Sequence, residues 1–170
     1  FDAGREVPME ETKRVVVAAH ELLTDYGVEP AIKYSGSRGF QIWAKFESHE
    51  LPEDYRPKPL RTERRERNMF AFYADIVRFL ESRVAEKLPG LTTAETAKKE
   101  ARRDKVLFDA SVYKPMGDVR APYSIHYKTG LVSMPLKPGE LRGFEPEWAD
   151  PERVAERYSE RGNEFELRPC

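Results

Sequence analysis

The sequence predicts an α+β fold for one domain that spans residues 1–170. Two long segments repeat their apolar residues at helical spacing, and short runs of alternating apolar and polar residues lie between and after them. Because these strands mix with helices and with glycine-containing hairpin turns, the α+β class follows. The chain has 170 residues, 39% of them apolar, which is enough for one domain that buries about 70% of its unfolded surface.

Composition limits the partners and cofactors. Charged residues form 35% of the chain, yet the net charge is −1, so any nucleic-acid site must come from local clustering. The one cysteine, Cys170, excludes a disulfide framework and a cysteine-based zinc site. No apolar run approaches the roughly 18–20 residues of a membrane span, so we expect an intracellular, cytoplasmic protein without membrane contact. The chain begins at Phe1 without a methionine, and we interpret it as a fragment.

Each element of the N-terminal half has its own signal. Pro8 and the acidic pair that follows it suit the first turn of a helix, and Gly27 ends that helix. Beyond it, alternating residues around two glycines predict a hairpin. The elements expected here are a strand end at 1–4, a helix at 8–27, a strand at 31–34, a turn at 36–39 and a strand at 40–46.

The C-terminal half is predicted in the same way. Thr92 and Glu95 resemble a capping box, and Asp150 with Pro151 suits the start of a helix. The elements expected here are a loop at 47–61, a helix from 62 to 87, a helix from 92 to 104, a strand at 105–112 that contains Asp109, a hairpin at 121–136 that turns at 128–130, and a helix at 150–161.

The stretch "YSGSRGFQIW" carries the first candidate site. Glycines at 36 and 39 permit a backbone that exposes its N–H groups, and Ser35 adds a hydroxyl. Arg38 adds a planar guanidinium that suits phosphate oxygens. The loop could therefore hold a phosphate; the alternative is a flexible hairpin with a solvated arginine.

Two carboxylates suggest a metal site. Asp109 directly follows the apolar residues 106–108, and a buried carboxylate there needs a partner or a metal. Asp2 follows an aromatic residue at what we expect to be a strand end. Together they would suit Mg²⁺ or Mn²⁺, which prefer oxygen ligands. The alternative is an aspartate at a strand end that faces water.

Basic residues supply the remaining candidates. Arg120, His126 and Lys128 lie on the second predicted hairpin, where a structural, hydrogen-bonded histidine is the alternative to a ligand-binding one. A cluster on the helix at 62–87 could contact nucleic-acid phosphates, although a solvated helix face is the alternative. The cluster consists of Arg61, Arg64, Arg65 and Arg67.

Taken in order, these motifs resemble the archaeo-eukaryotic primase superfamily, which includes small primase subunits and the polymerase domains of bacterial end-joining ligases. "FDAG" is similar to the end of its first motif, "YSGSRGFQIW" to its second, "KVLFDASV" to its third, and "RAPYSIHYKTGLVSMPL" to its hairpin. The resemblance implies a mixed β-sheet of RRM-like character flanked by helices. It also implies that Asp2 and Asp109 are catalytic metal ligands. The nucleotide-binding positions that it implies are Ser35, Arg38, Gln41, Arg120 and His126.

The implied function is template-directed nucleotidyl transfer, as in a DNA primase or a primase-polymerase of replication or repair. Its partners would be nucleoside triphosphates, a DNA template and primer, and a large primase subunit, ligase or helicase. Two departures favour a degenerate domain that binds nucleotide or nucleic acid without catalysis. Gln41 replaces the histidine of the second motif, and the first aspartate would lie just before Phe1. A plain α+β interaction domain, in which Arg38 and Asp109 bind nothing, is the remaining alternative.

Overall fold

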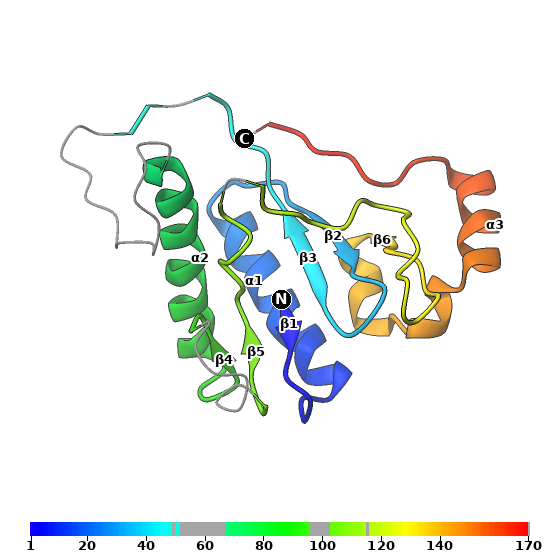
Figure 1. Ribbon diagram of the computed structural model, residues 1–170, viewed down its shortest axis with the longest axis horizontal. Helices are drawn as coiled ribbons and strands as arrows, with labels where there is room; N and C mark the ends of the chain where they lie inside the picture. Colours follow the sequence, from blue (N-terminus) through cyan, green and yellow to red (C-terminus); the bar gives the residue numbers. More distant parts are fainter. Residues whose placement is uncertain (49, 52–66, 96–102, 115, 170) are drawn as a thin grey trace.

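The computed structural model describes residues 1–48, 50–51, 67–95, 103–114 and 116–169 (Figure 1). Helices and short strands are intermixed, which confirms the α+β prediction. The elements in order are β1 (Asp2–Ala3), α1 (Met9–Asp25), β2 (Ala31–Tyr34), β3 (Phe40–Trp43), α2 (Arg67–Lys87), β4 (Thr92–Thr93), β5 (Val106–Leu107), β6 (Pro135–Leu136), the 3₁₀ helices η2 (Pro138–Gly143) and η3 (Pro146–Ala149), and α3 (Pro151–Arg161). In the described part of the chain, no helix has both the length and the apolar character needed to cross a membrane.

The strands form two three-stranded sheets that meet at Phe1. One sheet has the order β1-β5-β4, with β4 and β5 parallel, and the other has the antiparallel order β3-β2-β6. The two are joined by backbone hydrogen bonds, because the Phe1 amino group donates to the Phe40 carbonyl at 2.9 Å and the Phe40 N–H donates to the Phe1 carbonyl at 3.3 Å. This junction places the end of β1 beside the turn between β2 and β3.

Helix α1 packs against both sheets and lies behind the strands in Figure 1. Val15 belongs to a buried cluster with Val84 of α2 and Val106 of β5. The next residue, Val16, belongs to a second cluster with Tyr34, Phe40 and other buried residues of the β3-β2-β6 sheet. Burying an aliphatic side chain of this size is worth roughly 1.5–3 kcal/mol. One helix therefore holds the two sheets in a fixed relation.

Several predicted elements are confirmed. Helix α1 ends before Gly27, whose φ of +79° suits a residue that follows a helix. The β2–β3 hairpin has the expected register, although β3 ends at Trp43 rather than at residue 46. Asp150 caps α3 by accepting hydrogen bonds from the N–H groups of Glu152 and Arg153. These elements were predictable because their signals are local.

The predicted capping box at Thr92 and Glu95 is wrong. Thr92 lies in β4, which pairs in parallel with β5, and its hydroxyl donates to Glu81 of α2 at 2.8 Å. Pairing with β5 overrides the local signal. The remainder of that predicted helix falls largely on residues 96–102, outside the described residues. The strand predicted at 105–112 is also shorter, so that Asp109 lies two residues beyond the end of β5.

The predicted hairpin at 121–136 keeps its turn but lacks a regular ladder. Gly130 donates its N–H to the His126 carbonyl at 2.9 Å, and the single bridge of the hairpin pairs Ile125 with Val132. Tyr123 has a φ of +62°, which few side chains adopt, and the backbone bends there. Beyond the hairpin, β6 pairs with β2.

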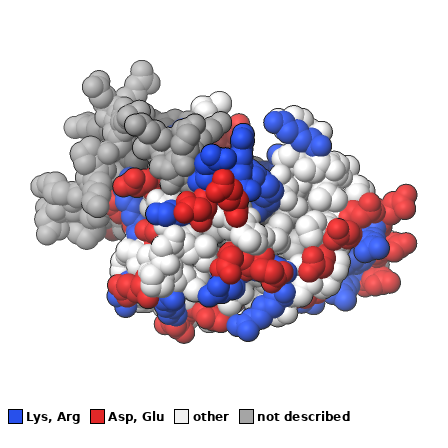
Figure 2. Space-filling model, turned by 90° about the horizontal axis from the view of Figure 1, so that it is seen from below, with Lys and Arg blue, Asp and Glu red and all other residues white. Residues whose placement is uncertain are grey.

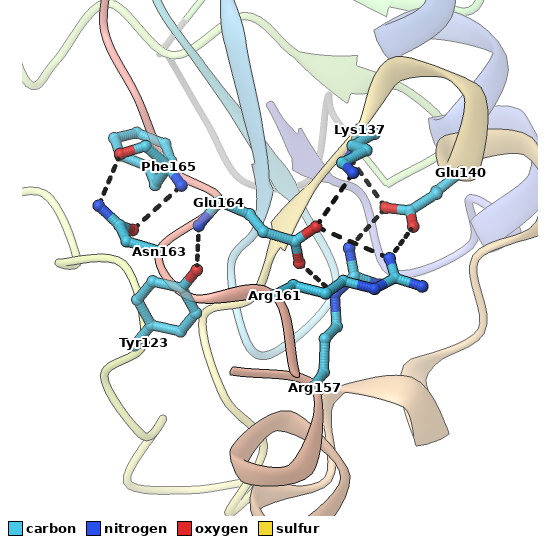
Figure 3. Close-up of polar contacts among 8 residues, drawn as sticks. All are labelled: Tyr123, Lys137, Glu140, Arg157, Arg161, Asn163, Glu164 and Phe165. Atoms are coloured by element: carbon cyan, nitrogen blue, oxygen red, sulfur yellow. Dashed lines mark hydrogen bonds and ion pairs between the residues drawn. The ribbon is translucent and has the colours of Figure 1, made fainter. Parts of the chain in front are cut away.

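An ion cluster fastens the segment that follows α3 (Figure 3). Arg157 contacts Glu140 of η2 at 2.7 Å and also bonds Glu164, whose side chain is 8% exposed. The Glu164 N–H donates to the Tyr123 hydroxyl at 2.8 Å, and the Phe165 ring packs edge-on against Trp43. The C-terminal segment thereby covers part of the face of β3 that carries Trp43. The ion cluster comprises Lys137, Glu140, Arg157, Arg161 and Glu164.

Candidate active site

A cavity of about 720 Å³ brings together the seven candidate residues of the first three motifs and the hairpin. Its size lies in the range typical of small-molecule sites. The β2–β3 hairpin, helix α2 and residues 108–120 form its walls. The candidates that line it are Asp2, Ser35, Arg38, Gln41, Asp109, Arg120 and His126.

The turn at residues 35–39 is held in shape by its own hydrogen bonds. The Ser35 hydroxyl accepts from the N–H groups of Ser37 at 3.3 Å and Gly39 at 3.2 Å, and the Ser35 N–H donates to the Gly39 carbonyl. The Tyr34 hydroxyl donates to the Ser37 carbonyl. The N–H groups of Gly36 and Arg38 find no acceptor in the described part of the chain. A turn fixed in this way leaves two backbone donors available to a ligand.

Both glycines of the turn are required by close neighbours. Gly36 has a φ of +83°, and a Cβ there would lie 2.9 Å from the His126 Cβ. The Thr129 hydroxyl donates to the Gly36 carbonyl, which ties the second hairpin to the turn. A Cβ on Gly39 would lie well inside 3.0 Å of the Phe1 carbonyl oxygen. The turn therefore packs against the second hairpin through Gly36 and against β1 through Gly39.

Replacing Gly39 with alanine is expected to destabilise the fold, because a methyl group would collide with backbone rather than with a movable side chain. Overpacking of this kind costs roughly 2–3 kcal/mol, and for a chain of this length that lowers the Tm by about 5–10 °C. Thermal and urea unfolding would measure the loss. Gly139→Ala is the matched control, since a Cβ there meets nothing within 4 Å. Equal Tm values for the two variants would contradict the packing argument.

Two carboxylates meet at the joined end of the sheets. Asp2 pairs with Leu107 across the β1–β5 ladder, and Asp109 lies two residues beyond Leu107. Burial lowers the pKa of the Phe1 amino group, whereas the charges of Asp109 and Asp2 both act to raise it, so both carboxylates lie near this group. Asp109 is fixed by the Ser111 N–H, which donates to its Oδ1 at 2.8 Å. These two side chains are the ones that could hold a divalent cation.

The pair alone is an incomplete metal site. Within the described residues, no group of three or more histidine, cysteine or acidic side chains is arranged to hold a metal ion. Asp118 also lines the cavity but does not complete such a group. The donor set is nevertheless of the right kind, because Mg²⁺ and Mn²⁺ prefer carboxylate oxygens.

Arg120 and His126 form the basic wall of the cavity. Burial lowers the pKa of His126, and the positive charges of Arg120 and Lys128 lower it further. The Lys128 N–H donates to His126 Nδ1 at 3.3 Å, so the neutral ring carries its proton on Nε2. Lys128 itself is not a lining residue, and its ammonium lies 5.4 Å from the centre of the Tyr127 ring. The wall thus offers Arg120 and a neutral imidazole donor.

The predicted arginine cluster is not tested. Arg61, Arg64 and Arg65 lie outside the described residues, and Arg67 begins α2 with a side chain that is not described. Figure 2 shows Lys and Arg interspersed with Asp and Glu on the face in view, rather than collected into one basic patch. The nucleic-acid role of the cluster therefore remains a prediction.

Sequence reasoning missed the aromatic wall of the cavity. Tyr73 of α2 stacks between Phe46 and Tyr113, with ring centres 6.3 and 5.8 Å away and interplanar angles of 26°. Trp43 also lines the cavity. These residues belong to separate elements, so no spacing in the sequence predicts that they meet. The cavity therefore combines a polar end, formed by the turn and the carboxylates, with a wall suited to flat rings.

Comparison with known proteins shows the family to which this chain belongs. A family model described as "LigD, primase-polymerase domain" matches residues 1–165, and the chain belongs to this family. Comparison with curated proteins gave no match.

A solved structure shares the fold. It is the polymerase domain from Mycobacterium tuberculosis ligase D in complex with DNA, which is 24% identical to this chain with a TM-score of 0.70. The match covers 96% of this chain and 50% of that chain, so this chain spans about half the length of its structural neighbour.

Proposed function

We propose that this chain carries out template-directed nucleotidyl transfer, adding a nucleotide from a nucleoside triphosphate to a 3′-hydroxyl or starting a primer. The observation that carries the proposal is the single cavity in which Asp2 and Asp109 lie with the phosphate-sized turn and the basic hairpin. Phosphoryl transfer asks a protein mainly to position its reactants and to neutralise charge. The cavity contains groups for both tasks.

The triphosphate would be held by donors from two hairpins. The free N–H groups of Gly36 and Arg38 and the exposed Arg38 guanidinium come from the β2–β3 turn. Arg120 and the Nε2–H of His126 come from the second hairpin. Gln41 can donate a hydrogen bond but adds no charge, unlike the histidine of the family pattern. Ser35 orders the turn through its acceptor and keeps its hydroxyl proton for a phosphate.

Asp2 and Asp109 would hold two Mg²⁺ or Mn²⁺ ions together with the aspartate that the family places just before Phe1. Extending the β1–β5 register by two residues sets that position opposite Asp109. Bound divalent ions lower the pKa of the attacking hydroxyl and neutralise the leaving pyrophosphate. The protein keeps these ligands beside the turn through the Phe1–Phe40 hydrogen bonds.

The nucleic-acid partner would be a DNA primer and template, and a ligase would be the associated enzyme. Two observations support this: the family is named for ligase D, and the neighbouring structure was determined in complex with DNA. The aromatic wall beside the polar end of the cavity is suited to stacking a base.

Titration of a fluorescent nucleoside triphosphate with Mn²⁺ tests the site. Arg38→Ala is expected to weaken binding about 10- to 100-fold, the effect of removing a charge-assisted hydrogen bond to a phosphate. Arg142→Ala is the matched control, because Arg142 is also exposed but lies in η2 and does not line the cavity. Binding that is indifferent to Arg38→Ala would mean that the turn is only structural.

Gln41 favours a second candidate, a domain that binds nucleotide without catalysis. A neutral side chain at this position offers less charge to the triphosphate than a protonated histidine would. Under this candidate, nucleotide binding still depends on Arg38, but primer extension is absent from the full-length protein. Primer extension by the wild-type protein, compared with its Asp109→Asn variant, separates the two candidates.

A further inference from the structure

Two lysines are buried in the part of the chain that the structure describes, and their polar surroundings differ. Lys13 on α1 is 2% exposed, and its ammonium has a full set of partners. It donates to the carbonyls of Phe144 at 2.9 Å and Arg142 at 3.2 Å, and it lies 2.5 Å from Glu10. Lys13 therefore has the partners expected of a buried lysine whose role is structural: two carbonyl oxygens and a carboxylate.

Lys33 on β2 is 0% exposed and has far fewer partners. Its ammonium donates to the Ser133 hydroxyl at 2.6 Å, and that hydroxyl donates in turn to the Tyr34 carbonyl. No carboxylate pairs with Lys33 in the described part of the chain. Burial lowers its pKa to about 8, and the charge of Arg120 acts in the same direction. At neutral pH the ammonium is therefore mostly protonated, with two N–H groups uncommitted.

Lys33 lies directly behind the wall of the cavity. Its cross-strand partner is Gln41, and directly opposed residues in an antiparallel pair share a face. The ammonium is also 5.9 Å from the centre of the Trp43 ring. Gln41, Trp43 and Arg120 all line the cavity, and the Oε1 atom of Gln41 is buried with no hydrogen-bond partner among the described residues. On the side of Lys33 that faces the cavity, the Gln41 Oε1 atom and the Lys33 ammonium therefore have fewer hydrogen bonds than they could form.

Lys33 is a buried cation and Arg120 is a partly exposed cation close enough to lower the pKa of Lys33, so an incoming anion would relieve the repulsion between the two charges. Lys33 does not itself line the cavity, and we propose that its ammonium supplies positive charge behind this wall, which together with Arg120 makes the wall a subsite for the triphosphate. This inference rests on the proposed function and assigns a role to a residue outside the family motifs.

Triphosphate affinity of the intact chain tests the inference. Lys33→Met is expected to weaken binding of a fluorescent nucleoside triphosphate with Mg²⁺ roughly tenfold, and inorganic triphosphate should compete less well by the same factor. Lys13→Met is the matched control: it also removes a buried lysine, but the partners of Lys13 do not line the cavity, so the change should leave affinity unchanged. Thermal unfolding reports whether each variant is folded.

The pH profile provides a second readout. A bound triphosphate favours the ammonium form, so the affinity of the wild-type protein should fall as pH rises through about 8. Of the groups that face Lys33, Gln41, Ser133 and Trp43 do not titrate, and Arg120 keeps its charge in this range. Lys33→Arg should therefore bind well and lose this fall in affinity.

Each outcome bears on the inference. If Lys33→Met binds like the wild type, or if Lys33→Arg keeps the fall above pH 8, Lys33 is structural and the inference is overturned. If Lys33→Met does not fold, the profile of Lys33→Arg decides. Binding that depends on Arg38 but not on Lys33 would overturn the inference and leave the proposed function intact, whereas a wild-type chain that binds no triphosphate would overturn both.

Discussion

Primer extension by the full-length protein is expected to fall roughly a thousandfold when Asp109 is replaced by asparagine. Under the proposed function Asp109 would be a metal ligand, and its loss would forfeit several kcal/mol of charge stabilisation; about 4 kcal/mol corresponds to that factor. Asparagine keeps the Oδ1 acceptor that binds the Ser111 N–H at 2.8 Å, so the local turn should survive. The measurement is extension of a labelled DNA primer on a template with Mn²⁺.

Asp104→Asn is the control for this experiment. Asp104 is exposed at the other end of β5 and does not line the cavity, so its replacement should leave extension unchanged. Full activity in the Asp109→Asn protein would contradict the assignment of the metal ligands. A wild-type protein that binds triphosphate but never extends a primer would instead support the degenerate, binding-only domain.

Replacing Arg157 with methionine is expected to lower the free energy of unfolding by about 2 kcal/mol, between the values typical of exposed and of buried ion pairs. For a chain of this length, that lowers the Tm by roughly 4–8 °C. Arg157 is the shared partner of Glu140 and Glu164 in the ion cluster, and methionine retains the apolar bulk of its stem. Thermal unfolding at neutral pH measures the change.

The same variant should flatten the dependence of stability on pH. Burial raises the pKa of Glu140 and of Glu164, but the hydrogen bonds and charge of Arg157 outweigh it, and both pKa values lie below normal. Their contribution is therefore present above the unfolded pKa of about 4.3 and is lost as pH falls through the folded values. Arg153→Met, on the same helix but outside the ion cluster, is the control. Identical pH profiles for the two variants would show that the cluster adds no stability.

Sequence reasoning succeeded where the signals are local or ordered along the chain. Helix α1, the β2–β3 hairpin and the cap of α3 were predictable from periodicity and turn residues. The order of the motifs also predicted the residues that share the cavity, because a resemblance to a family carries information about tertiary structure that spacing lacks.

The failures have a common physical origin in contacts between distant segments. Thr92 forms a strand because β5 offers it a ladder, which no local pattern reveals. Lys33 looks like an ordinary charged strand residue, and it is buried only because neighbouring segments cover its face of the sheet. The stack of Phe46, Tyr73 and Tyr113 exists only once α2 stands beside the two loops.

The contact between Gly39 and the Phe1 carbonyl has a consequence for protein engineering. It means that main-chain atoms, rather than side chains, set the spacing between β1, which carries Asp2, and the turn at residues 35–39. Side chains elsewhere on the cavity, such as those of the aromatic wall, can then be exchanged to alter the preference for a base or a sugar. The distance over which a phosphoryl group would travel stays the same throughout such a redesign.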